Sequence, residues 1–380
     1  MQLLHVIPST DPATGGPAQG LRCILKGHER LGCSAEVLSN DAPASQHDTD
    51  IQSPVHHLGP GKGVYGYNTR LLFWLRENYA RFDGVIAHGI WQYPALAVRR
   101  TVLGKRPYVV FTHGMLDPWF RKAYPLKHLK KYLYWLLALY PVLRDAKRVL
   151  FTSPLEQELA PKSFSPYKCH GEVVPYGTLP PEDDPELSKK AFHRLCPSVK
   201  GHRYLLFIAR LHEKKGCELL LQAFANVCKD QPDFDLVMAG PDNVGLKTKL
   251  QSLAMELGIA ERVHWPGMLN GDAKWGAFRN CEAFILPSHQ ENFGIAVAEA
   301  MACARPVLIT NKVNIWPDIV QSHSGLVEDD TLEGTGSLLQ RFLRLDEAER
   351  TSMGENGMAF FHAHYNSLET AAAIQKIFSI

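Results

Sequence analysis

The fold is decided by residues 283–309, which read AFILPSHQENFGIAVAEAMACARPVLI. The stretch opens with a short apolar run that ends at Pro287, and this pattern predicts a buried strand. A polar turn follows and ends at Gly294. The alanine-rich run after it has good helix propensity and stops before Pro306, where residues 306–310 predict a second strand. A strand, a loop, a helix and a strand in this order form the building block of a parallel α/β sheet.

Two carboxylates in this stretch are unusual for a purely structural unit. Glu291 lies in the loop at the carboxyl end of the first strand, where open α/β sheets bind ligands. Glu299 is the only charge in an otherwise apolar helix, and a buried carboxylate needs a partner. The backbone amides of residues 292–295 have no intrahelical acceptors and lie at the positive end of the helix dipole, so they suit a phosphate. The structural alternative is a helix with a salt-bridged glutamate in the core.

The spacing Glu-x7-Glu, with Asn-Phe-Gly directly after the first Glu, resembles the retaining glycosyltransferases of family four, which have the GT-B fold. The resemblance extends over the whole chain and is strongest over residues 204–327. It implies an α/β protein of two Rossmann-like domains that face each other across a cleft. It also implies that Glu291 contacts the donor sugar and that Glu299 hydrogen-bonds the ribose of the nucleotide. The amides that would meet the sugar and the diphosphate are those of Asn292, Phe293, Gly294 and Ile295.

Composition supports two globular domains without deciding their ligands. The chain has 380 residues, 45% of them hydrophobic, and a net charge of +2. Its eight cysteines are scattered with no Cys-x-x-Cys spacing, which predicts small buried side chains in a reducing compartment. No signal peptide is visible, and no apolar run approaches the roughly 20 residues of a membrane span. We therefore expect a cytoplasmic protein, possibly peripheral on the inner membrane surface.

The clearest linker is the proline-rich and acidic segment 175–185. It predicts an N-terminal Rossmann-like domain over residues 1–175, which would bind the acceptor. A second Rossmann-like domain, residues 176–362, would bind the nucleotide-sugar donor. The last segment, 363–380, should be a helix that packs back on the N-terminal domain, as the resemblance implies.

In the first half, glycines and histidines follow predicted strands. Gly15 and Gly16 come after the first strand, where a glycine-rich loop can meet a diphosphate with its backbone amides. The resemblance implies that they touch the donor's phosphate and sugar, while the alternative is a tight turn that needs glycine. His113 lies at the carboxyl end of a strand, and the resemblance places it against the donor sugar near the reaction centre. His88 has the same form and is a weaker candidate, for the acceptor.

In the second half, Arg210 follows a strand directly and Lys215 precedes a helix. Arginine offers a fork of donors to a phosphate, and lysine offers a compact charge. The Arg-x4-Lys-Gly pattern resembles the family's diphosphate-binding pair, and surface basic residues are the alternative. The resemblance also places backbone groups near Met268 against the nucleotide base, without identifying that base.

We predict that no metal ion and no other cofactor is required. Paired carboxylates occur at Asp48 with Asp50 and at Asp233 with Asp235, and we interpret both pairs as solvated surface. The four residues 153–156, Ser-Pro-Leu-Glu, predict a capping box at the start of a helix.

Residues 121–148 combine a basic stretch with an aromatic and apolar run from Tyr132 to Tyr140. A segment of this kind can lie on an anionic bilayer and dock a lipid-linked or anionic acceptor. The alternative is an ordinary helix with one core face and one solvated basic face. The basic residues of the stretch are Arg121, Lys122, Lys127, Lys130, Lys131, Arg144, Lys147 and Arg148.

These patterns, and above all the family resemblance, imply a retaining glycosyltransferase of the hexosyltransferase type. It would move a sugar from a nucleoside-diphosphate sugar to a glycan or lipid-linked acceptor, in polysaccharide, lipid-linked oligosaccharide or glycolipid synthesis. The catalytic residues would be Glu291, His113, Arg210 and Lys215, and no nucleic acid is expected as a partner. Two alternatives remain: a GT-B sugar-nucleotide epimerase, and a non-catalytic protein that binds a sugar nucleotide.

Overall fold

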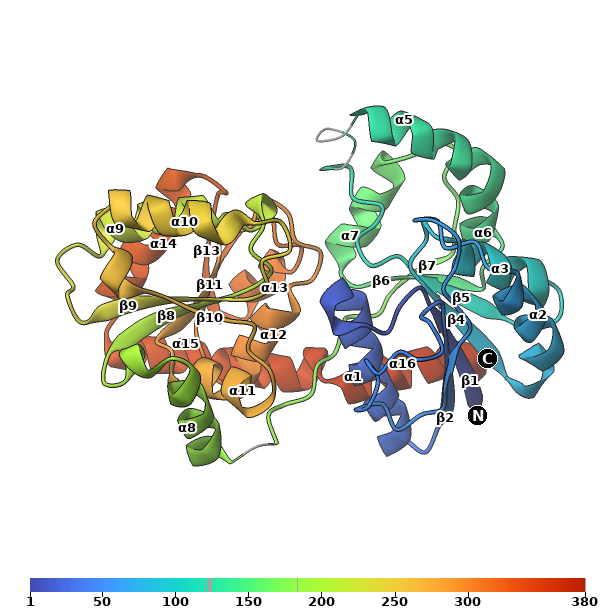
Figure 1. Cartoon of the computed structure of the whole chain (residues 1–380), viewed down its shortest axis with the longest axis horizontal. Helices are drawn as coiled ribbons and strands as arrows, with labels where there is room; N and C mark the ends of the chain where they lie inside the picture. Colours follow the sequence, from blue (N-terminus) through green and yellow to red (C-terminus); the bar gives the residue numbers. More distant parts are fainter. Residues whose placement is uncertain (120, 122–124, 183, 380) are drawn as a thin grey trace. The chain divides into compact units, whose positions relative to one another are not determined.

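The computed structural model describes residues 1–119, 121, 125–182 and 184–379. They divide into two compact units, the first of Met1–Thr178 with Tyr365–Ile380 and the second of Leu179–His364. In each unit a parallel sheet is covered by helices on both faces (Figure 1). Within the described part of the chain, no helix is both long enough and apolar enough to cross a membrane.

The first unit has a seven-stranded sheet in the order β3-β2-β1-β4-β5-β6-β7 within the described residues. Every pairing between neighbouring strands is parallel. The strands are β1 (Gln2–Ile7), β2 (Ser34–Ser39), β3 (Val55–His57), β4 (Gly84–His88), β5 (Tyr108–Phe111), β6 (Arg148–Phe151) and β7 (Gly171–Val173). Central strands such as β4 are buried along their whole length, as expected for a sheet covered on both faces.

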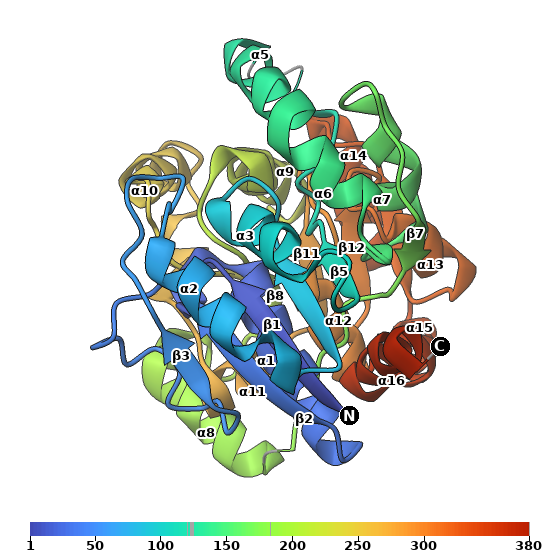
Figure 2. The same cartoon turned by 90° about the vertical axis from the view of Figure 1, so that its right-hand side faces the viewer.

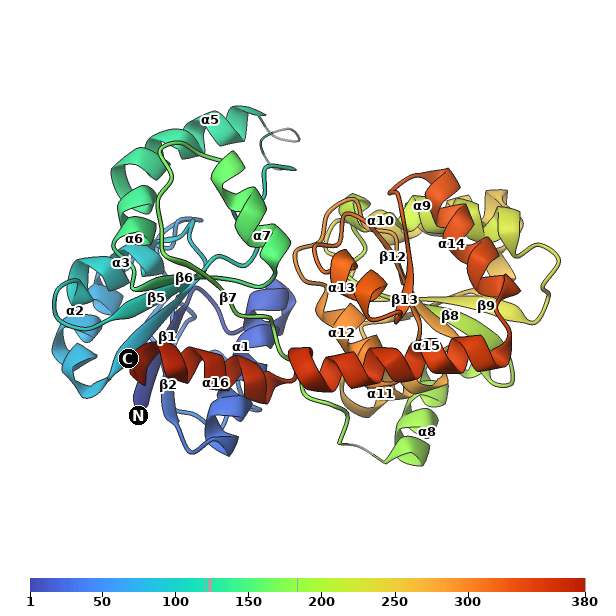
Figure 3. The same ribbon diagram turned by 180° about the vertical axis from the view of Figure 1, so that it is seen from behind.

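Helices connect these strands, and the last helix of the chain returns to the first unit. Helix α16 lies beside α1 (Figure 3), and a Cβ atom at Gly27 of α1 would come within 2.6 Å of the Ser367 carbonyl oxygen. Glycine therefore permits this close approach. The helices are α1 (Gly16–Arg30), α2 (Thr69–Asn78), α3 (Tyr93–Val102), α5 (Pro125–Tyr134), α6 (Tyr140–Arg144), α7 (Pro154–Leu159) and α16 (Ser367–Ser379), and a π-helical segment, η3 (Trp135–Leu139), joins α5 to α6.

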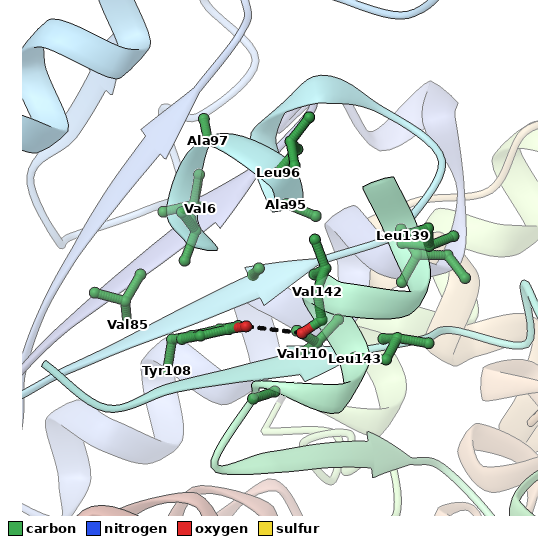
Figure 4. Packing of buried hydrophobic residues seen from close by; sticks show 14 of the residues in the cluster. Val6, Val85, Ala95, Leu96, Ala97, Tyr108, Val110, Leu139, Val142 and Leu143 are labelled. Atoms are coloured by element: carbon green, nitrogen blue, oxygen red, sulfur yellow. Dashed lines mark hydrogen bonds between the residues drawn. The ribbon is translucent and has the colours of Figure 1, made fainter. Parts of the chain in front are cut away.

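The core of the first unit lies between the sheet and the helices α3 and α6 (Figure 4). Val85 and Val110 of the strands and Val142 and Leu143 of α6 belong to one cluster, and all four side chains are buried. The hydroxyl of buried Tyr108 donates to the carbonyl oxygen of Val142 at 2.8 Å, so its one polar group is satisfied. This packing fixes the strands whose carboxyl ends carry the histidines described below.

The second unit has a six-stranded parallel sheet in the order β10-β9-β8-β11-β12-β13 within the described residues. Its strands are β8 (Arg203–Ile208), β9 (Phe234–Ala239), β10 (Val263–Gly267), β11 (Ala283–Leu286), β12 (Val307–Thr310) and β13 (Gly325–Glu328). Its helices are α8 (Pro185–Leu195), α9 (Cys217–Val227), α10 (Leu246–Glu256), α11 (Gly271–Asn280), α12 (Ile295–Ala302), α13 (Trp316–Gln321), α14 (Leu332–Arg344) and α15 (Glu347–Phe360).

Both sheets run outward in two directions from the first strand of their unit. The strand order changes direction between β1 and β4 in the first unit, and between β8 and β11 in the second. In an open α/β sheet, ligands bind outside the carboxyl ends of the strands at this switch point. The topology therefore selects the loops after β1 and β4, and the loops after β8 and β11, as the places to look for a site.

Candidate active site

The loops after β8 and β11 of the second unit are held together by a glycine. Gly216 precedes α9 in a left-handed conformation with φ 66°, and a Cβ atom there would come within 2.0 Å of the Pro287 carbonyl oxygen. Only glycine fits this position. The short helix Glu213–Lys215 directly before it therefore lies against the loop that follows β11, and the amide of His289 donates to the Lys214 carbonyl at 2.8 Å.

This contact brings two predicted residues together. The Lys215 ammonium donates to the Glu291 carboxylate, and the two form an ion pair with both side chains mostly buried. The backbone of Glu291 is fixed as well, because its amide donates to Lys312 at 2.9 Å and its carbonyl accepts from Asn314 at 3.0 Å. The pair lies at the switch point of the sheet. The sequence analysis predicted this location for each of the two residues on separate grounds.

The charge state of Glu291 follows from its neighbours. Burial acts to raise the pKa of the carboxyl, but the charge and hydrogen bond of Lys215, the charge of Lys214 and the Asn292 amide outweigh it. The pKa of Glu291 is therefore lower than its usual value. At neutral pH this residue is a carboxylate, so it accepts hydrogen bonds and does not act as an acid.

The amino end of α12 follows Glu291 directly. Gly294 precedes the helix in a left-handed conformation with φ 74°, and α12 begins at Ile295. The Asn292 amide donates to the Glu291 carboxylate at 3.2 Å, so one of the four amides predicted to face a phosphate already has an acceptor. The amides of Gly294 and Ile295 lie at the positive end of the helix, where an anion is stabilised.

Glu299 is buried in α12 and is paired with Lys274 of α11 at 2.6 Å. The partner that a buried carboxylate requires is therefore a lysine that the sequence reasoning did not identify. The only sequence signal for Lys274 is a basic residue in the helix that precedes β11. This salt bridge corresponds to the alternative in which Glu299 is a paired glutamate in the core. The contact of Glu299 with a ribose stays a prediction.

Arg210 and Met268 lie after the carboxyl ends of β8 and β10, at the same edge of the sheet. Both are exposed to solvent. The Arg210 guanidinium makes no hydrogen bond or ion pair with any residue that the structure describes. The second unit thus gathers Arg210, Lys215, Met268, residues 292–295 and the two glutamates at one edge of its sheet.

The other predicted residues belong to the first unit. Gly15 follows β1 with φ 99°, and Gly16 is the first residue of α1, so their amides lie at the amino end of a 15-residue helix. A helix start at a switch point is a suitable position for a diphosphate. A Cβ atom at Gly15 would have no heavy atom within 4 Å, so its positive φ, and not crowding, calls for glycine.

His113 is the half-buried last member of a row of rings that begins with the buried His5 and His88. His5 Nδ1 lies 2.9 Å from His88 Nε2, and His88 Nδ1 lies 3.2 Å from His113 Nε2. The other nitrogen of His113 is hydrogen-bonded to the Tyr176 hydroxyl. Successive rings are stacked with their planes within 27° of each other, and His28 lies beside His5 with a centroid distance of 5.4 Å.

This row is electrically neutral. Burial lowers the pKa of His28 to about 4 and that of His113 to about 3. Burial also lowers the pKa values of His5 and His88, and repulsion from neighbouring imidazoles adds to the effect. The first unit therefore presents uncharged hydrogen-bonding groups at its switch point, in contrast to the charged edge of the second unit.

Glu156 of α7 holds the turn that carries His113. Its buried carboxylate accepts from the Thr112 hydroxyl at 2.5 Å and the Gly114 amide at 2.6 Å. It also accepts from the amide and hydroxyl of Thr152 at 2.7 and 2.8 Å. The predicted capping box is therefore only half right, because Ser153 caps the helix at 3.1 Å while Glu156 reaches past it to the neighbouring strand ends. The sequence analysis did not predict this second role of Glu156. The available signal is a glutamate beside the end of a buried strand.

A cavity of about 210 Å³ lies in the first unit beneath α5. The Lys131 ammonium lies 4.2 Å from the centroid of the Trp91 ring at its edge. Apolar and aromatic walls with a few polar groups are typical of sites that bind sugars and other small molecules. The lining residues are Trp91, Met115, Asp117, Lys127, His128, Lys131 and Phe164.

The interpretation of the paired aspartates as solvated surface is wrong for Asp235. Its buried carboxylate accepts from His264 at 2.7 Å and lies 3.1 Å from His202. Asp50 is exposed as predicted and is paired with Arg22, while Asp48 is half-buried and is paired with His57. Among the residues that the structure describes, no group of three histidines, cysteines or carboxylates could hold a metal ion.

Comparison with known proteins gives the class. A glycosyl transferase 4-like domain model matches residues 15–177, and a model of the glycosyl transferases group 1 matches residues 188–360. The chain belongs to this family of glycosyltransferases, which confirms the predicted family. The D-inositol 3-phosphate glycosyltransferase of an Arthrobacter species is 27% identical over 240 residues, which cover 61% of this chain and 55% of that protein. The chain spans about half the length of the curated relatives it matches.

Solved structures give the fold. HepE of Anabaena, in complex with UDP and glucose, matches 100% of this chain and 99% of its own with a TM-score of 0.79 and 18% identity. The same protein has also been solved with UDP-glucose. WaaG, a glycosyltransferase involved in lipopolysaccharide biosynthesis, matches with a TM-score of 0.68 and 18% identity over 98% of this chain and 99% of its own. The predicted GT-B fold class, with two Rossmann-like α/β domains, is confirmed.

Proposed function

We propose that the protein transfers a sugar from a nucleoside-diphosphate sugar to an acceptor hydroxyl, with retention of configuration at the anomeric carbon. The observation that carries the proposal is the Lys215–Glu291 pair at the switch point of the second sheet, directly before the amino end of α12. A cation, a carboxylate and a helix start suit the diphosphate and the hydroxyls of a sugar nucleotide. UDP-glucose is the first donor to test, because it is bound in HepE.

In this proposal the second unit stabilises the leaving group. The bond between the anomeric carbon and the diphosphate oxygen breaks, the acceptor oxygen bonds to that carbon, and the acceptor's hydroxyl proton passes to the departing diphosphate. The negative charge that grows on the diphosphate meets Lys215, Arg210 and the amides at 292–295. Fixed charges and dipoles aimed at developing charge are usually the largest contribution to catalysis. These groups would do the work of a divalent cation, so we propose transfer that needs no metal and no other cofactor.

The two glutamates would hold the two ends of the donor. Glu291 is a carboxylate at neutral pH, so it accepts hydrogen bonds from a sugar hydroxyl, and it releases Lys215 to the diphosphate when the donor arrives. Glu299 would accept from the ribose in the same way, with Lys274 fixing its orientation from α11. Backbone groups near Met268, at the end of β10, would face the base.

The first unit would supply neutral contacts. Gly15 and Gly16 would meet the diphosphate through the amino end of α1, and His113 would hydrogen-bond the sugar near the reacting carbon. The acceptor would occupy the cavity beneath α5, where Trp91 and Phe164 offer apolar faces to a sugar ring. Its two lysines outnumber Asp117 and so favour an acceptor with negative charge. A polysaccharide, lipid-linked oligosaccharide or glycolipid acceptor fits these features. The role of WaaG in lipopolysaccharide biosynthesis lends support.

A donor screen followed by one isosteric substitution tests the proposal. UDP-, GDP-, ADP- and TDP-sugars are compared by thermal shift with and without EDTA, since a ligand of the folded state raises the melting temperature. For the donor that shifts, Glu291→Gln removes the charge and keeps the shape. We expect transfer to fall at least about a hundredfold while nucleotide affinity changes by less than about tenfold.

The alternatives give different results in the same assay. An epimerase would convert the donor with no acceptor present and form no glycoside. A non-catalytic binding protein would show the thermal shift but no turnover with any acceptor. Unchanged transfer by the Glu291→Gln variant would contradict the assignment of this residue, and an inverted glycosidic bond in the product would contradict retention.

A further inference from the structure

Helix α5 and the π-helical segment after it expose five leucines to solvent. The exposed fractions are 78% for Leu126, 72% for Leu129, 63% for Leu133, 42% for Leu136 and 75% for Leu137. Their spacing of three and four residues places them on one side of the helix. We call these five residues the leucine face. An exposed helix surface is normally polar, so a continuous apolar stripe of this length marks an interaction site.

The opposite side of the same helix already supplies the contacts that hold it in place. Trp135 is buried and donates to the Pro166 carbonyl at 2.9 Å, and Leu139 is buried in the core. The His128 ring stacks on Phe164 at 4.3 Å between centroids. The leucine face is therefore not needed for packing within the unit. Figure 2 shows α5 at one end of this unit.

The predicted alternative for residues 121–148, a core face with a solvated basic face, describes this helix only in part, because its solvated face carries five exposed leucines beside Lys127 and Lys130. The basic stretch is also shorter than predicted. Arg144 is paired with Asp145 at 2.7 Å and Arg148 with Glu172 at 3.1 Å, and Lys122 lies outside the described residues. The part that remains for a partner is α5 with the π-helical segment, about 15 residues, which is too short to span a bilayer.

The charges beside the leucine face have one sign. Residues 118–144 contain six lysines and arginines and no aspartate or glutamate. Lys130 is exposed among the leucines, and Lys127 is exposed at their edge. A neighbouring loop adds Val64, which is 95% exposed. This loop is held to the helix by the hydrogen bond between the Tyr65 and Tyr134 hydroxyls at 3.0 Å.

These observations decide between the possible partners. A second copy of the chain on this face would bring the lysines of one copy against those of the other, which repel each other. An anionic bilayer offers apolar chains to the leucines and negative headgroups to the lysines. We propose that the leucine face of α5 lies in the interface of an anionic phospholipid bilayer, with the helix parallel to the membrane plane. The long lysine side chains would extend to the headgroups.

The proposal also places the cavity beneath α5 close to the membrane surface. Lys127 and Lys131 contribute to its lining from the same helix, so an acceptor carried by a lipid would meet the cavity where the helix meets the membrane. This consequence rests on the proposed function. The membrane contact itself does not, because it can be measured with no donor and no acceptor present.

Vesicle binding tests the apolar part. The full-length protein is sedimented with vesicles of phosphatidylcholine alone, and with vesicles that contain 30% phosphatidylglycerol. The double variant Leu129→Asp, Leu133→Asp should bind the anionic vesicles at least about a hundredfold more weakly, because each buried leucine contributes about tenfold or more in affinity. Both side chains are exposed, so the fold should be unaffected, and the melting temperature checks this. The matched control is Leu187→Asp on α8, a leucine 58% exposed, which should change binding by less than about twofold.

Salt and charge variants test the electrostatic part. Binding to the anionic vesicles should fall as ionic strength rises, and Lys130→Glu should weaken it about tenfold or more, since each basic residue near the surface contributes about fivefold. Lys190→Glu, an exposed lysine of α8, is the matched control and should have little effect. Equal binding to neutral and anionic vesicles would overturn the proposal. So would a dimer, seen by light scattering, that the two leucine substitutions dissociate.

Discussion

The carboxyl edges of the two sheets share a topology and differ in charge. Both sheets run outward from their first strand, and both place their predicted site residues at the carboxyl edge, most of them at or beside the switch point. The edge of the second unit carries ion pairs, Lys215 with Glu291 and Lys274 with Glu299. The edge of the first unit carries a row of neutral imidazoles that ends at the Tyr176 hydroxyl. The same fold thus positions two kinds of chemistry.

The difference corresponds to the two parts of a sugar nucleotide. A diphosphate is anionic and gains most from fixed cations and a helix start. A sugar ring is uncharged, and neutral donors and acceptors bind its hydroxyls without the cost of burying a charge. Three predictions test this contrast, beginning with the largest expected effect.

The first unit should lose stability in mild acid. Its four imidazoles, His5, His28, His88 and His113, have lowered pKa values and stay neutral in the folded state, while in the unfolded chain they bind protons below their ordinary pKa of about 6.5. Stability is therefore retained above that pH and lost as the pH falls toward about 4. At pH 5.5 each imidazole should cost about 1.4 kcal/mol, or about 5 kcal/mol for the four. Urea unfolding from pH 7.5 to 5 measures it.

A single substitution separates this effect from general acid sensitivity. His88→Asn should reduce by about one the number of protons taken up on unfolding, whatever it does to stability at pH 7.5. His170→Asn, at an exposed histidine of the same unit, should leave the pH dependence unchanged. If both variants keep the slope of the native chain, the row is not the source of the acid sensitivity.

Transferase activity should fall when the ammonium group of Lys215 in the second unit is removed. Lys215→Ala should lower kcat by about a hundred- to a thousandfold, the usual loss when one fixed group that stabilises transition-state charge is deleted. Lys214→Ala deletes the same charge one residue away and should cost less than about fivefold. Steady-state kinetics on the donor found in the nucleotide screen measure both variants. Equal losses of kcat in the two variants would mean that the overall positive charge of the loop, and not the ion pair of Lys215 with Glu291, supports catalysis.

Local sequence patterns were sufficient for the fold class and the family. Alternating apolar runs and helical segments predict a parallel α/β sheet, and the spacing of Glu291 and Glu299 lies within one strand-loop-helix unit. The contact between Lys215 and Glu291 spans 76 residues, but each residue follows a strand, so a parallel sheet with a switch point brings them to one edge.

The remaining features depend on long-range register and packing. His5 and His88 are 83 residues apart, and they meet only because β1 and β4 are neighbours in parallel register. Lys274 is the partner of Glu299 because of how α11 packs, which no local pattern gives. The outward orientation of the leucines in α5 was also invisible, since the apolar run there is typical of a core helix. Only the packing of Trp135 and Leu139 shows which side faces the core.

The smallest of the three effects should come from the neutral edge. His113 has a positive φ of 52°, which asparagine tolerates better than other side chains, so His113→Asn removes the ring with little backbone strain. Because it deletes one neutral hydrogen bond to the sugar, we expect kcat/KM to fall about tenfold. The loss should not depend on salt, unlike that of Lys215→Ala.

His323→Asn is the matched control, an exposed histidine with φ 53° in the second unit, and it should leave kinetics unchanged. A loss for His113→Asn as large and as salt-dependent as that for Lys215→Ala would mean that the imidazole is charged when the donor is bound, and the contrast between the two edges would then fail.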